Sequence, residues 1–179
     1  MVRRAKIAFL DRDGVVNESV VINGKPYAPK TFDQFKILPK VAESLINLKN
    51  AGYIIAIVTN QPDVSLGRQT LNNLNAMHNY LLSNYAIDVI KVCVHSDNDF
   101  CHCRKPKPGM LLEIAEEYGV APEICIMVGD RWRDIEAGQR AGCKANYFID
   151  YNYNEKRPSG SFELVSSLYD CTLKIINQI

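Results

Sequence analysis

Two carboxylates stand close together directly after the first apolar segment of the chain. Asp11 and Asp13 follow the run Lys6–Leu10, and a single residue separates them. Side chains two residues apart in extended backbone face the same side, so these two point together while Arg12 points away. Carboxylates this close repel each other unless they share a proton or a cation. The pair therefore indicates acid–base or metal chemistry.

A second acidic segment follows later in the chain. Asp130 comes after the apolar run Ile124–Val128, and Asp134 lies one helical turn further on. If the two apolar runs form neighbouring strands of a parallel sheet, three or four carboxylates converge at their carboxyl ends. Hard oxygen ligands of this kind are typical of a magnesium site.

A simpler interpretation is that these aspartates only end strands as turn residues. The sequence between the acidic segments argues against this interpretation. A strand there ends in side chains with hydroxyl and amide groups, Thr59, Asn60 and Gln61, and a basic pair, Arg104 and Lys105, follows later. We therefore favour the catalytic interpretation.

Three cysteines and a histidine gather within eleven positions. They form the pairs Cys93-x-His95 and Cys101-x-Cys103, which can meet as a tetrahedral zinc site. His102 is a competing ligand, but choosing it would leave Cys93 without a partner two residues away. Buried or redox-active thiols are the alternative to a metal. The remaining cysteines are expected in the core, namely Cys125, Cys143 and Cys171.

Composition excludes several classes of protein. The 179 residues carry 21 basic and 20 acidic side chains, so no general attraction to nucleic acid or to a membrane surface is expected. The basic run Arg104-Lys105-x-Lys107 is too short to follow a nucleic-acid backbone, and phosphate clamping is the better interpretation. The longest nearly apolar run, Ala51–Val58, falls well short of the about 20 residues of a membrane helix. Without a secretory signal either, we expect a cytoplasmic location.

Short aliphatic runs alternate with longer amphipathic segments. The expected strands are Lys6–Leu10, Tyr53–Thr59, Val89–Val94, Ile124–Val128 and Ala145–Ile149. The expected helices are Val41–Asn50, Thr70–Asn84, Gly109–Tyr118, Arg131–Ala141 and Ser161–Ile176. His78 belongs to a mostly polar helix and is expected to be exposed.

This alternation predicts an α/β fold with a Rossmann-like parallel sheet, a strand order of about 3-2-1-4-5 and helices on both faces. Residues 1–179 are expected to form a single domain. The insertion Val15–Pro39 and the Cys/His loop Cys93–Pro108 do not fit the alternation, and long loops of this kind are usually functional. The insertion is too short to form a large cap domain.

In combination, these motifs resemble those of the haloacid dehalogenase superfamily. The resemblance lies in Asp11-Arg12-Asp13-Gly14, Thr59-Asn60-Gln61, Arg104-Lys105-Pro106 and Gly129-Asp130. Asn17 after the first motif and the stretch from Cys101 to Met110 are similar to the histidinol-phosphatase branch, and most of all to its heptose bisphosphate phosphatases. The resemblance extends over roughly Ile7 to Ile149.

The resemblance implies a magnesium-dependent phosphatase that forms an aspartyl-phosphate. Asp11 would be the nucleophile, and Asp13 the general acid and base. Magnesium would be held by Asp11, the backbone carbonyl of Asp13 and Asp130, with Asp134 and Arg131 in support. Substrate would be held by Asn17, Thr59, Asn60, Gln61, Arg104 and Lys105. A structural zinc ion is implied at Cys93, His95, Cys101 and Cys103.

The insertion and one departure from the family pattern bear on the substrate. Polar groups of the insertion suit a small phosphorylated sugar: Asn17, Asn23, Lys25, Tyr27 and Lys30. Arg104 is a candidate for a second phosphate, and Trp132 is either a sugar-facing platform or a packing residue. Leu66 stands where the family usually has an arginine, with Arg68 nearby, which leaves the sugar and its anomer open.

Three functions remain open for what is expected to be a monomer. The first is hydrolysis of a sugar bisphosphate, most simply heptose 1,7-bisphosphate at its 7-phosphate. The second is hydrolysis of histidinol phosphate, a cation that would favour an acidic residue near the insertion, where Glu18 is the candidate. The third is a non-catalytic, zinc-bearing interaction module, which is disfavoured because every catalytic position is filled.

Overall fold

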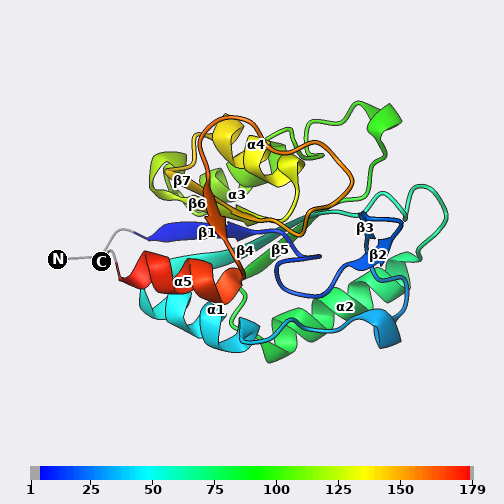
Figure 1. Cartoon of the computed structure of the whole chain (residues 1–179), viewed down its shortest axis with the longest axis horizontal. Helices are drawn as coiled ribbons and strands as arrows, with labels where there is room; N and C mark the ends of the chain where they lie inside the picture. Colours follow the sequence, from blue (N-terminus) through cyan, green and yellow to red (C-terminus); the bar gives the residue numbers. More distant parts are fainter. Residues whose placement is uncertain (1–4, 178–179) are drawn as a thin grey trace.

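A parallel sheet lies between two layers of helices in the structure, a computed structural model that describes residues 5–177 (Figure 1). The strand order is β5-β4-β1-β6-β7-β8. The strands are β1 (Lys6–Leu10), β4 (Tyr53–Asn60), β5 (Val89–Cys93), β6 (Ile126–Gly129), β7 (Ala145–Ile149) and β8 (Glu163–Val165). The five predicted strands therefore lie in the predicted order, and β8 extends one edge of the sheet.

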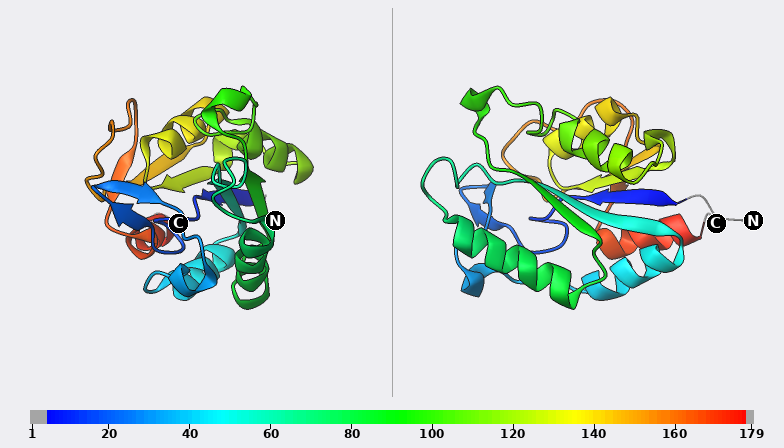
Figure 2. Two further views of the ribbon diagram at one scale, coloured as in Figure 1. Left: turned by 90° about the vertical axis from the view of Figure 1, so that its right-hand side faces the viewer. Right: turned by 180° about the vertical axis from the view of Figure 1, so that it is seen from behind.

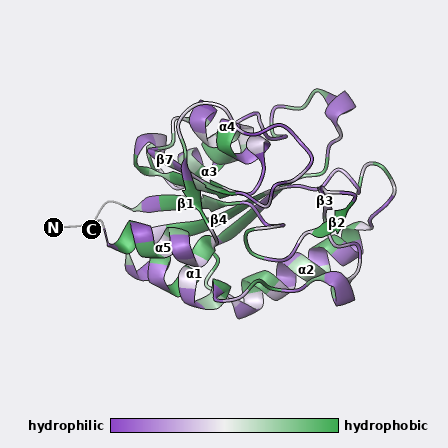
Figure 3. Cartoon of the chain, in the orientation of Figure 1, coloured by the Kyte–Doolittle hydropathy of each residue, from purple (hydrophilic) through white to green (hydrophobic). Residues whose placement is uncertain are grey.

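Each face of the sheet is covered by its own set of helices (Figure 2). One face packs against α1 (Val41–Asn50), α2 (Leu71–Asn84) and α5 (Leu168–Ile176), and the other against α3 (Gly109–Glu117) and α4 (Trp132–Ala141). Along β1, Ala8 and Leu10 face the first set, whereas Ile7 and Phe9 face the second. A strand covered on both sides must be apolar throughout, and the central strands are coloured as hydrophobic in Figure 3.

A side-chain cap begins α2, and a glycine ends α4. The Thr70 hydroxyl accepts a hydrogen bond from the Asn73 backbone N–H at 3.2 Å at the start of α2. Gly142, with a φ of 84°, takes the left-handed conformation that ends α4. None of the helices within residues 5–177 combines the length and the apolar character that crossing a bilayer requires.

The predicted helix Ser161–Ile176 is wrong in its first half. Glu163–Val165 instead forms β8, which pairs in parallel with β7 and is the edge strand of the sheet. The helix α5 begins only after Ser167, whose hydroxyl accepts from the Asp170 backbone N–H at 3.1 Å. The N-cap of this helix is therefore Ser167 and not Ser161, the residue at which the predicted helix begins.

The insertion contains a small antiparallel hairpin that the strand analysis missed. Its strands are β2 (Val20–Ile22) and β3 (Lys25–Tyr27). The turn Asn23-Gly24 has positive φ values of 51° and 74°, as a tight hairpin turn of this sequence requires. The described chain also contains three 3₁₀ turns: η1 (Phe32–Gln34), η2 (Asp97–Asp99) and η3 (Pro122–Ile124).

The expectation that His78 is exposed is wrong. His78 is only 8% exposed, because it lies beside Met77 on the inward face of α2. Its Nε2 atom lies 3.1 Å from Nη1 of Arg12. Burial and the nearby charge of Arg12 lower the pKa of His78 to about 4. The ring is therefore neutral at physiological pH.

This lowered pKa predicts a pH-dependent stability. The pKa of His78 is lower in the folded chain than in the unfolded chain, so the unfolded chain binds a proton first as the pH falls. The folded state therefore has its full stability only above the ordinary pKa of histidine, and it loses stability as the pH falls toward 4. Between pH 7 and pH 5, we expect the unfolding free energy to fall by about 1–2 kcal/mol more than that of His78→Gln. Urea denaturation at both pH values measures this, and equal losses in the two proteins would contradict it.

Candidate active site

A cavity of about 750 Å³ opens at the carboxyl ends of the central strands. It lies where β1 is flanked by β4 on one side and β6 on the other, the place at which open α/β sheets bind ligands. Its charged lining comes from the strand ends, the hairpin, the loops and the start of α4: Asp11, Asp13, Lys25, Asp63, Arg68, Asp97, Arg104, Lys105, Arg131, Arg133, Asp134 and Glu155.

Three carboxylates are buried together at this junction. Oxygens of Asp11, Asp130 and Asp134 all lie within 4.8 Å of one another. Their residues are 6%, 1% and 2% exposed, respectively. Burial and the neighbouring charge of Asp134 raise the pKa of Asp11 to about 7. Burial and the charge of Asp11 also raise the pKa of Asp130 well above its ordinary value.

Two glycines make room for this cluster. A Cβ atom on Gly14 would lie 1.9 Å from Oδ2 of Asp130, and the φ of Gly14 is 87°. A Cβ atom on Gly129 would lie 2.1 Å from the Cβ of Asp134. No side chain fits at either position without moving a carboxylate, so both glycines serve the close approach of the acidic segments.

Lys105 supplies the positive charge inside the cluster. Although it is 1% exposed, its Nζ donates to Asp11 at 2.7 Å, to Asp134 at 2.6 Å and to the Val58 carbonyl at 2.7 Å. These contacts use all three ammonium protons. Burial alone would lower the pKa of Lys105, but the two carboxylates raise it to about 12.

One lysine does not neutralise three carboxylates, and the donor set fits a further cation. Both carboxylate oxygens of Asp130 are buried without a hydrogen-bond partner among the described residues. The nearby Tyr153 hydroxyl lowers the pKa of Asp130, which burial and Asp11 raise, but its position does not meet hydrogen-bond geometry. Unpaired, buried carboxylate oxygens beside Asp11 are suitable ligands for a hard divalent ion such as Mg²⁺.

Asp13 is held by nitrogen donors rather than by the lysine. Its carboxylate accepts hydrogen bonds from Nη2 of Arg12 at 2.9 Å, Nδ2 of Asn17 at 2.9 Å and Nε2 of Gln61 at 2.7 Å. Arg12 thus contacts its neighbour instead of pointing away, because its long side chain folds back beneath Asp13. Asp13 and Gln61 line the cavity.

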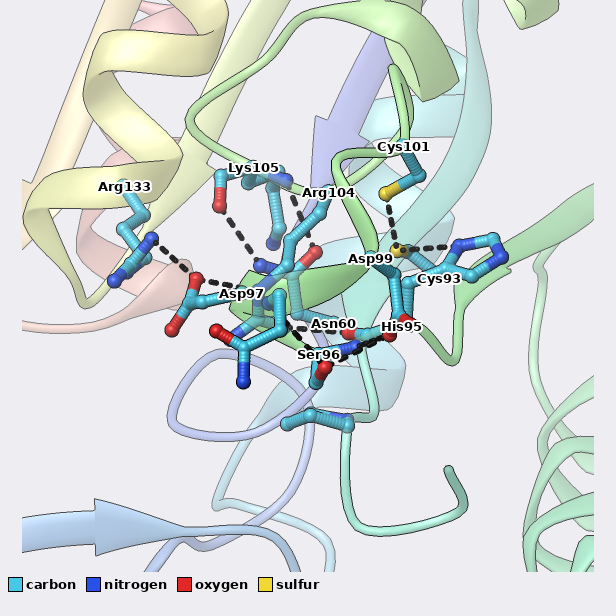
Figure 4. A network of polar contacts seen from close by, with 12 residues as sticks. Asn60, Cys93, His95, Ser96, Asp97, Asp99, Cys101, Arg104, Lys105 and Arg133 are labelled. Atoms are coloured by element: carbon cyan, nitrogen blue, oxygen red, sulfur yellow. Dashed lines mark hydrogen bonds and ion pairs between the residues drawn. The ribbon is translucent and has the colours of Figure 1, made fainter. Parts of the chain in front are cut away.

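The four predicted zinc ligands come together at one side of the cavity, and Figure 4 shows three of them, Cys93, His95 and Cys101. Sγ of Cys93 lies 3.7 Å from Sγ of Cys101 and 3.2 Å from Sγ of Cys103, and Nδ1 of His95 lies 3.3 Å from Cys103. Thiolates that share a tetrahedral Zn²⁺ ion are about 3.8 Å apart, so the cluster fits this ion. His102 points elsewhere, since its Nε2 lies 2.8 Å from Glu113.

Hydrogen bonds join the segment that follows the cluster, Arg104 and Lys105, to other residues of the cavity lining (Figure 4). The Asn60 side chain pairs with the Lys105 backbone, accepting from its N–H at 3.1 Å and donating to its carbonyl at 3.0 Å. Nε of Arg104 donates to Asp97 at 2.9 Å, and Nη1 of Arg133 lies 3.3 Å from the same oxygen. Arg104 also donates to the His95 carbonyl at 3.2 Å. Asp97 therefore joins two arginines of the cavity lining.

The other predicted substrate-binding residues lie in different surroundings. Asn17 is completely buried beneath Asp13, and Thr59 is 1% exposed behind Gln61, so neither is part of the cavity lining. Arg131 lines the cavity and pairs with Glu155. Trp132 also lines it, between the side chains of two cations: Lys156 Nζ lies 3.6 Å and Arg133 Cζ 4.6 Å from the ring centroid.

Sequence reasoning missed one wall of the cavity. Asn154 and Glu155 line it from the loop after β7, beyond the last recognised motif. The backbone N–H of Asn154 donates to the Gly24 carbonyl at 2.7 Å, which joins this loop to the hairpin. The only available signal was the loop's length and position after a strand. Of the insertion's polar groups, Lys25 and Tyr27 line the cavity, whereas Asn23 and Lys30 do not.

Curated relatives of this chain carry consistent names. D-glycero-beta-D-manno-heptose-1,7-bisphosphate 7-phosphatase from Pseudomonas aeruginosa is 38% identical over 143 residues, 77% of this chain and 78% of the relative. The enzyme of the same name from Helicobacter pylori J99 is 32% identical over 85% of this chain and 87% of the relative. The alpha-anomer enzyme of Photorhabdus laumondii is 29% identical over 93% and 94%.

Solved structures and a family model agree with these relatives. The crystal structure of D,D-heptose 1,7-bisphosphate phosphatase from B. bronchiseptica, complexed with magnesium and phosphate, is 29% identical with a TM-score of 0.83, covering 97% of this chain and 99% of that one. A family model described as haloacid dehalogenase-like hydrolase matches residues 5–142. The chain therefore belongs to the haloacid dehalogenase-like hydrolases.

Proposed function

We propose that the protein is a magnesium-dependent phosphatase that removes the 7-phosphate of D-glycero-D-manno-heptose 1,7-bisphosphate. The observation that carries this proposal is the buried cluster of Asp11, Asp130 and Asp134 around Lys105, at the end of a cavity with several further cations. The names of the relatives and the magnesium and phosphate bound by the B. bronchiseptica enzyme support it.

The residues of the site suit a two-step transfer. Asp11 attacks phosphorus and forms an aspartyl-phosphate, while Asp13 gives a proton to the leaving sugar oxygen. Asp13 then takes a proton from the water that attacks phosphorus and releases Asp11. Asn60, through its backbone N–H, and Lys105 line the cavity and supply donors for the phosphate oxygens. Lys105 reaches the phosphate by exchanging one of its present contacts.

Asp11, Asp130 and the backbone carbonyl of Asp13 are the ligands that we assign to magnesium. When bound, this ion supplies positive charge that lowers the repulsion between the nucleophile and the phosphate. The raised pKa of Asp11, about 7, reflects the need for such charge, because its anionic form is required for attack.

The remaining charges of the cavity favour a bisphosphate over histidinol phosphate. Each acidic lining residue outside the catalytic group is paired with an arginine: Asp63 with Arg68, Asp97 with Arg104 and Arg133, and Glu155 with Arg131. Lys25 adds a further cation, and the candidate acid Glu18 is exposed and outside the lining. The described lining thus offers cations for a second phosphate and no unpaired acid for an ammonium group.

We also propose that the Cys/His cluster holds a structural zinc ion. Three thiolates and a neutral histidine would give this site a net charge of −1, which Arg104 and Lys107 can offset. All four positions are filled by protein ligands, so the ion has no open position for chemistry. Its role is to hold the loop that carries Arg104 and Lys105 against Asn60.

The nucleophile assignment predicts the result of Asp11→Asn. The amide cannot attack phosphorus, so we expect kcat to fall by a factor of about 10³ or more. Phosphate release measures the loss, and circular dichroism confirms the fold. Turnover within tenfold of the unsubstituted chain would refute the assignment, as would equal loss in the exposed control Asn79→Leu.

The charge distribution of the cavity predicts substrate preference. In a magnesium-dependent phosphate-release panel, we expect both anomers of heptose 1,7-bisphosphate to exceed histidinol phosphate in kcat/KM by about 100-fold. Simple sugar monophosphates should be intermediate, because they lack the second phosphate. Preference for histidinol phosphate would instead support the histidine-biosynthetic function.

The zinc proposal predicts a binding defect. Cys101→Ser removes a zinc ligand and should loosen the loop that carries Arg104 and Lys105. We expect KM to rise by about tenfold, roughly the contribution of one charge-assisted hydrogen bond to substrate binding, and kcat to change less. Cys143→Ser, a half-buried cysteine outside the cluster, is the matched control. Metal analysis should show loss of zinc only in the first variant, and a folded, zinc-free protein with normal KM would contradict the proposed role.

A further inference from the structure

The acid–base residue Asp13 is held by an arginine that lies completely inside the protein. Arg12 is 0% exposed. Its Nε and Nη2 atoms approach the Asp13 carboxylate side-on, at 3.1 and 2.9 Å from Oδ1, and Nη2 also lies 3.1 Å from Oδ2. A guanidinium group keeps its charge when buried, so its remaining N–H groups also need acceptors.

His78 of α2 provides such an acceptor. It lies 66 positions along the chain from Arg12, and its Nε2 atom is 3.1 Å from Nη1. Since a guanidinium group can only donate, Nε2 must be unprotonated and the neutral ring must carry its proton on Nδ1. The Phe35 ring lies 5.6 Å from Cζ of Arg12 and further limits its movement.

Arg12 is the charged member of the group of donors that holds Asp13. The other two, Asn17 and Gln61, are neutral amides that each contact one carboxylate oxygen. Arg12 contacts both oxygens, and a two-point contact fixes the rotation of a carboxylate as well as its position. A shift of Arg12 would therefore release Asp13 from its main restraint.

We propose that His78, acting through Arg12, is a positioning residue for both proton transfers of Asp13, an inference that rests on the proposed phosphatase function. In the first transfer, Asp13 protonates the sugar oxygen as its bond to phosphorus breaks and the bond from Asp11 to phosphorus forms. In the second, Asp13 takes a proton from water as the water oxygen binds phosphorus and the bond to Asp11 breaks. Misplacement of the carboxyl group lowers the rate of each step more than it lowers substrate binding.

Three substitutions on α2 test this proposal. His78→Leu removes the hydrogen-bond acceptor and fills its space with an apolar side chain. His78→Gln replaces the imidazole nitrogen with an amide oxygen that can accept from Arg12. Asn79→Leu, at the exposed neighbouring position, is the matched control. With heptose bisphosphate, we expect His78→Leu to lower kcat about 10- to 100-fold and to change KM by no more than about twofold. His78→Gln should recover most of the loss, and Asn79→Leu should match the unsubstituted chain.

The substrate p-nitrophenyl phosphate separates positioning from general damage. Nitrophenolate leaves without needing a proton, so its release in the first turnover of His78→Leu should be as fast as in the unsubstituted chain. Later turnovers should slow, because hydrolysis of the aspartyl-phosphate still requires Asp13 as base. Rapid-mixing absorbance measures both phases. Disruption of the whole site would slow the first turnover as much as the later ones.

Two kinetic outcomes would overturn the proposal: equal kcat in His78→Leu and Asn79→Leu, or a first turnover slowed as much as the rest. Nitrogen NMR gives a readout that needs no activity, because the chain has three histidines and His78→Gln identifies the resonance of His78. We expect the Nδ1–H tautomer, and a proton on Nε2 would also overturn the proposal. Failure of the proposed function looks different: the unsubstituted chain and Asn79→Leu would both leave heptose bisphosphate intact.

Discussion

Burial of three carboxylates around one lysine is the constraint on which the rest of the structure depends. Asp11, Asp130 and Asp134 come from the end of β1, the end of β6 and the start of α4. Their repulsion within 4.8 Å is only partly offset by Lys105. The strand order that makes β1 and β6 neighbours thus creates a site that attracts a divalent cation and, through it, a phosphate.

The peripheral features of the fold can be understood from the need to place Lys105 and Asp13. Lys105 reaches the cluster because Asn60 fixes its backbone and the Cys/His cluster anchors the preceding loop. Asp13 is fixed from the opposite side by Arg12, which α2 supports through His78. Lys105 and Asp13 thus depend on separate supporting contacts, which substitutions can perturb independently.

Sequence patterns were sufficient for the parts of the protein in which local chemistry determines position. The apolar runs predicted the central strands, and the residue pairs around Cys93 and Cys101 predicted the Cys/His cluster. Patterns failed where tertiary contacts decide: Glu163–Val165 is a strand because β7 offers an edge, and His78 is buried because Arg12 needs an acceptor. The hairpin could have been found from Asn23-Gly24. The cavity wall at Glu155 could not, because the length of its loop and its position after a strand do not single out that residue.

The proposed mechanism requires that the carboxylate of Asp11 is bonded to the phosphoryl group between the two steps. Borohydride reduces an acyl-phosphate but leaves a free carboxylate intact, so it can be added to the magnesium-loaded protein quenched during turnover of heptose bisphosphate. Peptide mass spectrometry then locates the reduced residue. We expect conversion of Asp11 to homoserine only when substrate is present. Reduction at another carboxylate, or none at residue 11 during rapid turnover, would contradict it.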